Sequence, residues 1–544
     1  FCTTPWLTER HGYDPTSCGL CAVFIIYAYA GWKNKMRYIK AFFNKVFITA
    51  LLILIQAGWF VLFFMKLTEY SHWTRAFFAT LSLVIAVRII GKDENSEYKI
   101  SWIVLITILP LFGGLLYLCF GNKKPSKNMR KKLDMTHNEY LSQYAQDEKI
   151  MNDIKKDNLR IGEISGYLQK YSGFPLYVNT KTKYYRIGEE MFEDMLAELE
   201  KAEHFIFLEY FIIDDGLMWE KTLEILKRKV KQGVDVRLMY DDFGSLFLLP
   251  KDFVKQMESV GIKCMAFNPL VPFISAVMNN RDHRKILVID GHTGFTGGIN
   301  LADEYINRIH PHGHWKDTGI MLKGEAVWSF TLMFLEMWNS FRHEDICFDD
   351  YKPHRWHKEP FETDGFVQPF SDTPLDDENV GENVYIEMLN QTEDYVYIFT
   401  PYLIPDNEMK TAMCLAAKRG VDVRLVTPKI ADKKMVHRLT RSYYRPLLKS
   451  GVRIYEYTPG FIHAKSCVCD DIAGVVGTIN MDFRSLYLHF ECAAFFYKSS
   501  AVMQLKKDSL DTIARSEEIS EDFCSKGFFS TLLDSLLRLI APLF

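Results

Sequence analysis

The distribution of apolar residues divides the chain into two regions. The first contains uncharged apolar runs at 46–65 and 101–120, each long enough as a helix to cross the hydrocarbon layer of a bilayer. A shorter apolar run at 76–90 contains Arg88. Three placements of this run stay open: a span, a helix in the bilayer interface, or half of a tight hairpin. The pattern predicts a transmembrane region at 46–121, followed by a soluble remainder.

Basic residues flank this apolar region on both sides. Lys and Arg cluster at 33–45 before the first run and at 123–132 after the last. Because such clusters stay in the cytoplasm, the number of spans is expected to be even. We therefore predict two full spans with the catalytic region on the cytoplasmic side. Residues 1–45 form a basic segment of unclear status, and the late first run fits a cleaved signal peptide poorly.

The soluble remainder contains an internal repeat. The apolar run at 205–212 corresponds to that at 395–404, and the sequence GVDVRL at 233–238 recurs letter for letter at 420–425. The offset of roughly 180 to 190 residues suits duplicated domains rather than a solenoid. Strands and helices alternate in both copies, which predicts two pseudo-symmetric α/β domains with mixed sheets flanked by helices.

Charge and proline content suggest where the domains begin and end. We expect a charged linker at 122–175, the first domain at 176–343, a linker at 344–382 and the second domain at 383–544. The C-terminal sequence GFFSTLLDSLLRLIAPLF predicts an amphipathic helix. Such a helix either packs on the core or contacts lipid.

Each copy closes with the pattern His-x-Lys-x4-Asp. In an extended strand, His and Lys two positions apart project from the same face. Two facing copies would place two histidines and two lysines around one phosphodiester, as a double displacement requires: one His attacks phosphorus and the other protonates the leaving alcohol. The motifs are His283, Lys285 and Asp290 in the first copy, and His463, Lys465 and Asp470 in the second.

Small residues and an asparagine follow each motif at the same distance. Gly297-Gly298 and Gly477-Thr478 either let the backbone approach a bound phosphate or form a turn at the end of a strand. The asparagines Asn300 and Asn480 are candidate amide ligands.

A catalytic histidine usually needs a carboxylate on its second nitrogen. Asp317 and Glu491 lie downstream of the two motifs on apolar, strand-like runs, and are the candidates for this orienting role. A purely structural role for these two carboxylates is the alternative.

Composition narrows the set of cofactors and partners. A net charge of −3 excludes a globally basic nucleic-acid binder, and 11 cysteines without framework spacing are expected to be reduced. Neither Cys18/Cys21 nor the histidines at 310–314 complete a set of metal ligands, so we expect a pocket-lining loop at 310–314 and no metal site. No P-loop or Rossmann glycine motif occurs, so no cofactor is predicted.

The paired motifs resemble the phospholipase D superfamily, and the chain from Val46 onward is similar to its bacterial cardiolipin synthases. The resemblance covers about nine-tenths of the chain and implies two phospholipase D-like domains. It is carried by SWIVLITILPLFGGLLYLCFG, LEYFIIDDG, GGINLADEY, the Trp315/Asp317 element, TPYLIPD and NMDFRS.

The resemblance implies a reaction in which two phosphatidylglycerol molecules give cardiolipin and glycerol, without a nucleotide or an obligatory metal. His283 would form a phosphatidyl-histidine, while His463 would protonate glycerol and then deprotonate the second lipid. By the same analogy Lys285 and Lys465 would hold the phosphate and Asp317 and Glu491 would orient the histidines, with Asp290 and Asp470 organising their motifs.

The partners implied are phosphatidylglycerol and other anionic lipids, for a multi-pass enzyme of the bacterial cytoplasmic membrane. A phospholipase D-type hydrolase or a phosphatidylserine synthase-like transferase would use the same histidines and differ only in the acceptor. A non-catalytic membrane scaffold is disfavoured, because it would be expected to have lost motif residues, and all six are present.

Overall fold

Two mixed sheets with the same strand order form the centre of the computed structural model. Apart from positions 58, 62 and 66, the structure describes residues 72–109, 113–121, 123–269, 279–524 and 527–543. The first sheet has the order β1-β8-β6-β5-β2-β3-β4. Its strands are β1 (Thr180–Tyr185), β2 (Phe205–Tyr210), β3 (Asp235–Asp241), β4 (Lys263–Phe267), β5 (Ile286–Ile289), β6 (Thr293–Gly297) and β8 (Gly319–Gly324).

The second sheet repeats this order and adds one edge strand. Its order is β17-β12-β11-β10-β14-β15-β16-β9. In both sheets three parallel strands, β2-β3-β4 and β10-β11-β12, continue into antiparallel ones. The strands are β9 (Phe366–Asp372), β10 (Tyr395–Phe399), β11 (Asp422–Pro428), β12 (Arg453–Tyr457), β14 (Ser466–Cys469), β15 (Ala473–Gly477), β16 (Glu491–Tyr497) and β17 (Ser516–Glu518). The predicted pair of mixed-sheet domains is confirmed.

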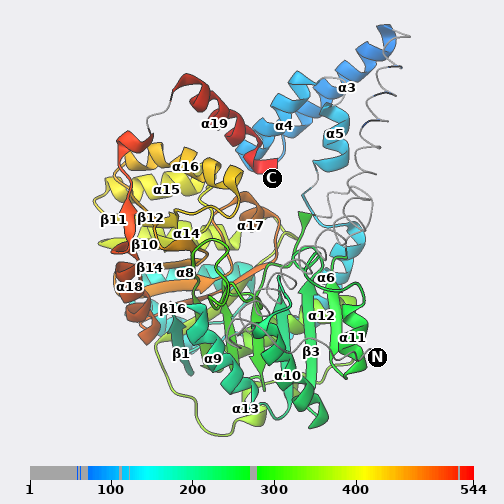
Figure 1. Cartoon of the computed structure of the whole chain (residues 1–544), viewed down its shortest axis with the longest axis vertical. Helices are drawn as coiled ribbons and strands as arrows, with labels where there is room; N and C mark the ends of the chain where they lie inside the picture. The colour runs from blue at the N-terminus through cyan, green and yellow to red at the C-terminus, as the bar shows by residue number, and fades with distance from the viewer. Residues whose placement is uncertain are drawn as a thin grey trace, which may run out of the picture. The chain divides into compact units, whose positions relative to one another are not determined.

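Helices cover the sheets, and the central strands are buried on both faces. All six residues of β2 are buried, which explains its continuous apolar sequence. The two GVDVRL segments enter β3 and β11, which are equivalent strands. Figure 1 shows the helices around the sheets; they are α9 (Gly188–Leu199), α10 (Leu217–Lys231), α11 (Phe253–Ser259), α12 (Val327–Phe341), α14 (Val380–Gln391), α15 (Asn407–Lys418), α16 (Lys434–Leu448) and α18 (Ser500–Ile513).

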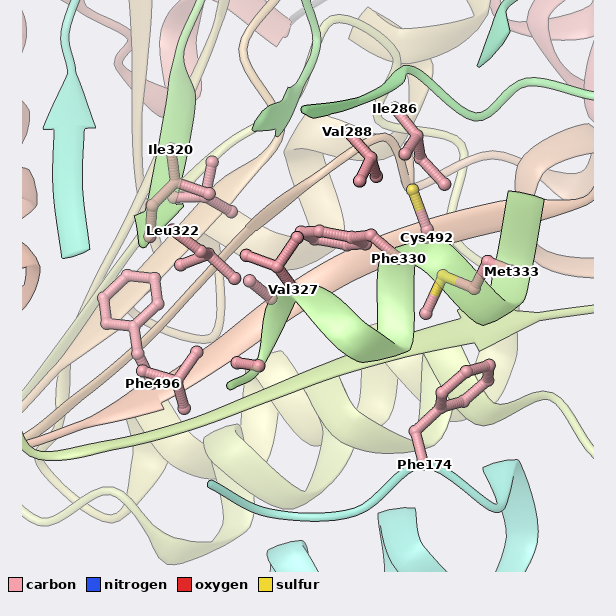
Figure 2. Packing of buried hydrophobic residues seen from close by; sticks show 14 of the residues in the cluster. Phe174, Ile286, Val288, Ile320, Leu322, Val327, Phe330, Met333, Cys492 and Phe496 are labelled. Atoms are coloured by element: carbon pink, nitrogen blue, oxygen red, sulfur yellow. The ribbon is translucent and has the colours of Figure 1, made fainter. Parts of the chain in front are cut away.

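The two domains share one hydrophobic core. Val288 and Leu322 from the first sheet, Phe330 from α12, and Cys492 and Phe496 from the second sheet belong to a single buried cluster (Figure 2). Helix α12 of the first domain packs on β9 of the second, and α18 of the second packs on β1 of the first. This exchange fixes the two sheets against each other and thereby positions the site between them.

The stretch expected as a charged linker at 122–175 is largely helical. It contains α6 (Lys127–Tyr140), α7 (Glu148–Asp157) and α8 (Leu159–Ser172). Helix α6 buries apolar residues in the core that the domains share, and α7 and α8 bury theirs in a second hydrophobic cluster. Within the second expected linker, β9 is the edge strand beside β16, and α13 (Pro353–Trp356) follows a short 3₁₀ turn.

The expected single helix over 101–120 is wrong. The chain forms α4 (Ser96–Ile108) and α5 (Gly113–Phe120), after α3 (His72–Ile90). Leu109 has φ −120° and ψ 65°, outside the helical region, as the steric effect of a following proline favours. A Cβ at Gly113 would lie 2.5 Å from the Ile106 Cα, so this glycine allows the two helices to pack closely.

The segment at 76–90 lies within α3. The basic segment at 1–45 is outside the described residues, and so is the expected span at 46–65 except for Gly58 and Leu62. Among the helices that the structure describes, none is both long enough and apolar enough to cross a bilayer.

The C-terminal amphipathic sequence forms α19 (Phe528–Ile540), which contacts α16 and α4 (Figure 1). Asp534 on this helix accepts a hydrogen bond from Arg438 at 2.7 Å, and the Ser101 hydroxyl donates to the Leu539 carbonyl at 2.5 Å. Helix α19 therefore joins the N-terminal helices to the second domain.

Candidate active site

The two motif histidines are held by backbone contacts that cross between the domains. The His283 N–H donates to the Phe490 carbonyl at 2.9 Å, and the His463 N–H donates to the Lys316 carbonyl at 2.7 Å. Beside His463, β13 (Gly460–Ile462) pairs in parallel with β7 (His314–Lys316) of the first domain. His283 precedes β5, and His463 lies between β13 and β14 (Ser466–Cys469), so neither His-Lys pair is inside a strand as predicted. Each histidine is therefore held by a backbone contact with the opposite domain.

The orienting carboxylates are exchanged between the domains in the same way. His283 Nδ1 lies 2.9 and 3.0 Å from the Glu491 oxygens, and His463 Nδ1 lies 2.7 Å from Asp317 Oδ2. Both carboxylates are completely buried. With Nδ1 held in this way, each imidazole keeps Nε2 for chemistry in the cavity that both histidines line.

Glu491 is held in its charged form by several donors. The hydroxyls of Ser485 and Thr478 donate to its two oxygens, and His489 Nδ1 lies 3.6 Å away. Burial raises the pKa of Glu491, but His283 and His489 outweigh burial and hold this pKa well below its ordinary range. A fixed negative charge thus lies behind the His283 ring.

Both histidines are neutral near pH 7. Burial lowers the pKa of His283 to about 3, against the opposing effect of Glu491. Burial, together with the positive charge of Lys465, lowers the pKa of His463 to about 4. A neutral imidazole has a lone pair available for attack on phosphorus, which is the state that a nucleophile needs.

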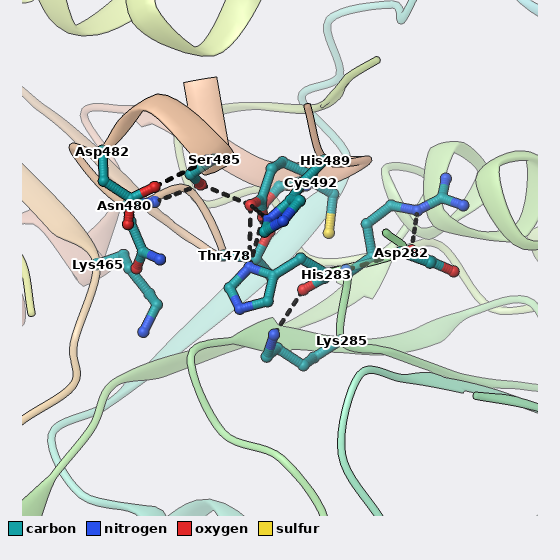
Figure 3. Close-up of polar contacts among 12 residues, drawn as sticks. Asp282, His283, Lys285, Lys465, Thr478, Asn480, Asp482, Ser485, His489 and Cys492 are labelled. Carbon is teal, nitrogen blue, oxygen red and sulfur yellow. Dashed lines mark hydrogen bonds and ion pairs between the residues drawn. The ribbon is translucent and has the colours of Figure 1, made fainter. Parts of the chain in front are cut away.

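The two lysines lie close to the histidines and to each other. Lys285 Nζ donates to the His283 carbonyl at 2.5 Å, and Lys465 Nζ donates to the His463 carbonyl. Figure 3 shows Lys285, Lys465 and Asn480 around the ring of His283. Burial lowers the pKa of Lys285 to about 8 and that of Lys465 to about 7. Neither lysine is among the residues that line the cavity.

The motif aspartates lie away from this cavity. Asp290 accepts the backbone N–H groups of residues 203, 204 and 205, and Asp470 accepts those of residues 393, 394 and 395. Both aspartates have positive φ, 48° and 50°. This geometry favours the organising role, because each aspartate caps the backbone that leads into β2 or β10.

The glycines after the first motif make room for Asp317. A Cβ on Gly298 would lie 2.0 Å from Asp317 Oδ1, and a Cβ on Gly297, at φ 150°, would lie 2.4 Å from the Thr318 carbonyl. In the second copy Thr478 takes the place of Gly298 and donates its hydroxyl to Glu491. These contacts favour a strand-end role for the glycines over an approach to phosphate.

The two asparagines differ in their environment. Asn300 accepts the Ile212 N–H at 3.0 Å and donates to the Tyr305 hydroxyl at 2.7 Å, so its amide is used within the protein. The Asn480 side-chain oxygen is buried and has no hydrogen-bond partner in the described part of the chain. Both residues line the cavity.

The histidines open into a cavity of about 480 Å³ between the domains. One wall is apolar and includes Leu439 of α16 and Leu537 of α19. Sequence reasoning assigned no place in the cavity to several polar and aromatic lining residues, although Arg484 lies in the NMDFRS segment, Tyr305 in GGINLADEY and Trp315 in the Trp315/Asp317 element. These residues include Arg281, Glu304, Tyr305, Trp315, Tyr402, Asp432, Lys433, Asp482, Arg484 and His489.

The histidine-rich loop at 310–314 does not line the cavity, contrary to the prediction. His314 lies 3.1 Å from the Tyr457 hydroxyl, because β7 turns its side chain toward the second domain. A different group, His283, His489 and Glu491, has potential metal-ligand atoms within 4.8 Å of one another. Both Glu491 oxygens and His283 Nδ1 already take part in hydrogen bonds, so this group fits a hydrogen-bonded network better than a metal site.

Two mixed-sheet domains that each place one motif histidine at a shared cavity, with the motif lysine close to it, define a phosphodiester-transfer enzyme of the phospholipase D type. A family model described as "Cardiolipin synthase, PLD-like domain" matches residues 195–316 and 385–510. A second, described as "Phospholipase_D-nuclease N-terminal", matches residues 80–122. The chain belongs to the cardiolipin synthase family of phosphatidyltransferases.

The chain aligns with its relatives over nearly the whole of their length. A cardiolipin synthase of Halalkalibacterium halodurans is 32% identical over 92% of this chain and 99% of the relative. An uncharacterised protein of Streptococcus mutans is 47% identical over 84% of this chain and 98% of the relative. The crystal structure of a phosphatidylserine synthase from Haemophilus influenzae has a TM-score of 0.51 at 13% identity, covering 71% of this chain and 98% of that one. That likeness shows the shared fold.

Proposed function

We propose that this enzyme joins two phosphatidylglycerol molecules into cardiolipin and glycerol through a phosphatidyl-histidine on His283. The observation that carries the proposal is the exchange of carboxylates: each of two neutral histidines at one cavity is oriented by a buried carboxylate of the opposite domain. Two oriented histidines supply the nucleophile and the acid that a double displacement requires.

In the first step His283 Nε2 attacks phosphorus, the bond between phosphorus and the glycerol oxygen breaks, and His463 gives its proton to that oxygen. His463 must first gain this proton, although its pKa is about 4 in the free protein. A phosphodiester anion bound beside the lysines would raise that pKa, because the anion favours the charged imidazole. The charge of Glu491 would stabilise the cationic phosphatidyl-histidine.

In the second step a hydroxyl of another phosphatidylglycerol attacks the same phosphorus. His463 accepts the hydroxyl proton, the phosphorus–nitrogen bond breaks, and His283 is regenerated. Lys285 and Lys465 each use one ammonium donor on a histidine carbonyl, which leaves donors for phosphate oxygens. Charge neutralisation at the reacting phosphate lowers the barrier of both steps.

The deciding experiment incubates the purified chain with labelled phosphatidylglycerol in liposomes or in detergent micelles, with and without added serine. Water is present as a competing acceptor in every sample. Cardiolipin and released glycerol in equal amounts are expected. Phosphatidic acid as the only product would contradict the proposal in favour of a hydrolase, and phosphatidylserine would favour the serine-type transferase. A His283→Ala variant and a His463→Ala variant should each lose at least about a thousandfold in rate.

We further propose that the enzyme works at the bacterial cytoplasmic membrane with its catalytic domains on the cytoplasmic side. Support comes from α19, whose charged residues face the protein while most of its large apolar residues, Leu537 excepted, face outward. Asp534 pairs with Arg438, and Arg538 donates to Ser442. The exposed residues are Phe528, Phe529, Leu532, Leu533, Leu536 and Ile540. A helix of this kind fits a lipid interface.

A triple Ser variant at Leu532, Leu533 and Leu536 tests this placement. We expect at least about a tenfold lower rate on phosphatidylglycerol vesicles and little change in detergent micelles, because the lost apolar area contributes only to contact with a bilayer. A matched control carries the same change at Leu159, Leu415 and Leu510, which are exposed on α8, α15 and α18. Equal losses in both variants would contradict a specific lipid contact of α19.

A further inference from the structure

One arginine that lines the cavity has no hydrogen-bond or close ion-pair partner in the part of the chain that the structure describes. Arg484 lies on the short helix α17 (Phe483–Tyr487) and is partly buried. Within the described residues its guanidinium makes no hydrogen bond and no close ion pair, and Asp482 acts on it only as a longer-range charge. Burying a cation without a partner is unfavourable, so such a residue in a ligand cavity suggests an anionic ligand.

Arg484 is tied to the His283 side of the cavity. Its chain neighbour Ser485 donates to the Glu491 that orients His283. The Arg484 carbonyl also accepts the N–H of His489, another cavity residue, at 3.0 Å. A ligand that contacts this guanidinium would therefore lie close to the reacting centre.

A second arginine, from the other domain, lines the same cavity. Arg281 lies two residues before His283, and its guanidinium donates to the Asn268 carbonyl at 2.8 Å and lies 3.7 Å from Asp241. Burial lowers the pKa of Arg281, and the positive charge of Arg484 lowers it further, so the two cations are close enough to repel each other. Burial raises the pKa of Asp241 to about 7, so this carboxyl offsets only part of the charge.

The proposed reaction requires two anionic positions. The reacting phosphate belongs beside Lys285 and Lys465, but the second phosphatidylglycerol carries a phosphate of its own. In cardiolipin the two phosphates are one glycerol apart, so the acceptor phosphate must sit one glycerol away from the reacting phosphorus. Water, serine and glycerol have no such group. A cationic second position would therefore separate a phospholipid acceptor from these small acceptors.

We propose that Arg484 and Arg281 form a second phosphate site, which binds the phosphate of the acceptor phosphatidylglycerol and selects an anionic lipid as acceptor. This proposal rests on the proposed function, since it assigns a site to the acceptor lipid of that reaction. Guanidinium groups suit this role, because their fork of donors matches the oxygens of a phosphodiester. Among the described residues no group accepts a hydrogen bond from the Arg484 guanidinium, and Arg281 adds a second charge held in place by the protein.

The test compares two reactions that share the first step. Cardiolipin formation needs both phosphate positions, whereas exchange of labelled glycerol into phosphatidylglycerol needs only the reacting one. In Arg484→Gln, cardiolipin formation should fall by roughly 10- to 100-fold, the effect of losing a charge-assisted hydrogen bond. Glycerol exchange should stay within about threefold of the parent enzyme, and phosphatidic acid should rise as water captures the intermediate.

Two further variants keep the test interpretable. Arg484→Lys retains the charge and should recover part of the cardiolipin rate, whereas a purely steric role would give no recovery. Arg445→Gln removes an exposed arginine outside the cavity and should leave both reactions unchanged.

The outcomes separate the two proposals. Parallel loss of glycerol exchange and cardiolipin formation in Arg484→Gln would overturn the second phosphate site, as would an unchanged cardiolipin rate. If the parent enzyme forms no cardiolipin and exchanges no glycerol, the proposed function itself fails.

Discussion

At the scale of single residues, the site depends on buried charges whose environments differ from water. The histidines are neutral, the carboxylates behind them are charged, and the lysines have depressed pKa values. Sequence spacing predicted that His and Lys would share one face of a strand, but both pairs lie just before β5 and β14, outside the strands. It also named Asp317 and Glu491 as orienting groups, but it did not indicate that each serves the histidine of the opposite copy. That pairing is a property of the domain interface.

Replacement of Glu491 by Gln should slow both half-reactions by roughly 100-fold or more, because the neutral amide no longer stabilises a positive His283 ring. Rates of glycerol exchange and cardiolipin formation measure the effect. Glu517→Gln, which removes one partner of an exposed ion pair with Lys429, is the matched control and should keep its full rate. A Glu491→Gln variant with the parent rate would mean that Glu491 is only structural.

The lowered pKa values of Lys285 and Lys465 predict an unusual loss of activity at high pH. The pKa values of Lys465 and Lys285 are about 7 and about 8, so both lose their protons as pH rises through this range rather than near the ordinary 10.5. Because the neutral amines no longer attract phosphate, kcat/KM should fall above pH 7 to 8. Profiles measured at limiting lipid check this.

The Lys465→Arg variant separates this cause from a general loss of the fold. Arginine stays charged to high pH, so the alkaline limb should move upward even if the maximal rate is lower. An alkaline limb of the parent enzyme near pH 10 would rule out depressed lysine pKa values in the free enzyme.

At the scale of elements, sequence patterns predicted where strands lie better than they predicted which strands pair and where helices end. The repeated GVDVRL gave equivalent strands β3 and β11, because continuous apolar runs are typical of strands buried on both faces. Strand β9 was assigned to a linker, since its place at the sheet edge depends on pairing with β16, far away in sequence. The break between α4 and α5 was missed because a uniformly apolar run hides a turn.

Gly298 is the residue at which close packing of two elements matters most for the site. In Gly298→Ala the new methyl group would overlap Asp317, so we expect a destabilisation of about 1 to 3 kcal/mol and a loss of rate as His463 loses its orientation. Thermal unfolding and cardiolipin formation measure the two effects.

Gly166 on α8 supplies the control for the same substitution. Its added Cβ would lie 3.9 Å from the Lys155 side chain, which is ordinary contact. Alanine there should be neutral or stabilise the helix by up to about 1 kcal/mol. If Gly298→Ala and Gly166→Ala have the same stability and the same rate of cardiolipin formation, the close approach of Gly298 to Asp317 does not affect function.

At the scale of the whole molecule, the two domains are interlocked rather than merely adjacent. They share one buried cluster, exchange the packing of α12 and α18, and exchange the carboxylates of the site. Duplication could be predicted from sequence, but interlocking could not, because the contacts involved have no local pattern.

A cut in the connection between the domains tests this interlocking. A protease site inserted between Lys358 and Glu359 lies in an exposed, irregular segment. After cleavage the halves should remain together on gel filtration and keep at least about half of the activity, because the shared core does not depend on chain continuity. Separation of the halves under native conditions, with activity retained by either one, would show that they are independent.

Gly298 with Asp317, and Thr478 with Glu491, occupy equivalent places but are different residues. A pair of identical halves would have a true twofold axis, and a substrate could then enter in either of two orientations with equal ease. Here Glu491 accepts an extra hydrogen bond from the Thr478 hydroxyl, whereas Asp317 packs against Gly298, which has no side chain. The equivalence of the two orientations is thereby removed, so one orientation of the substrate between the two histidines is expected to be preferred.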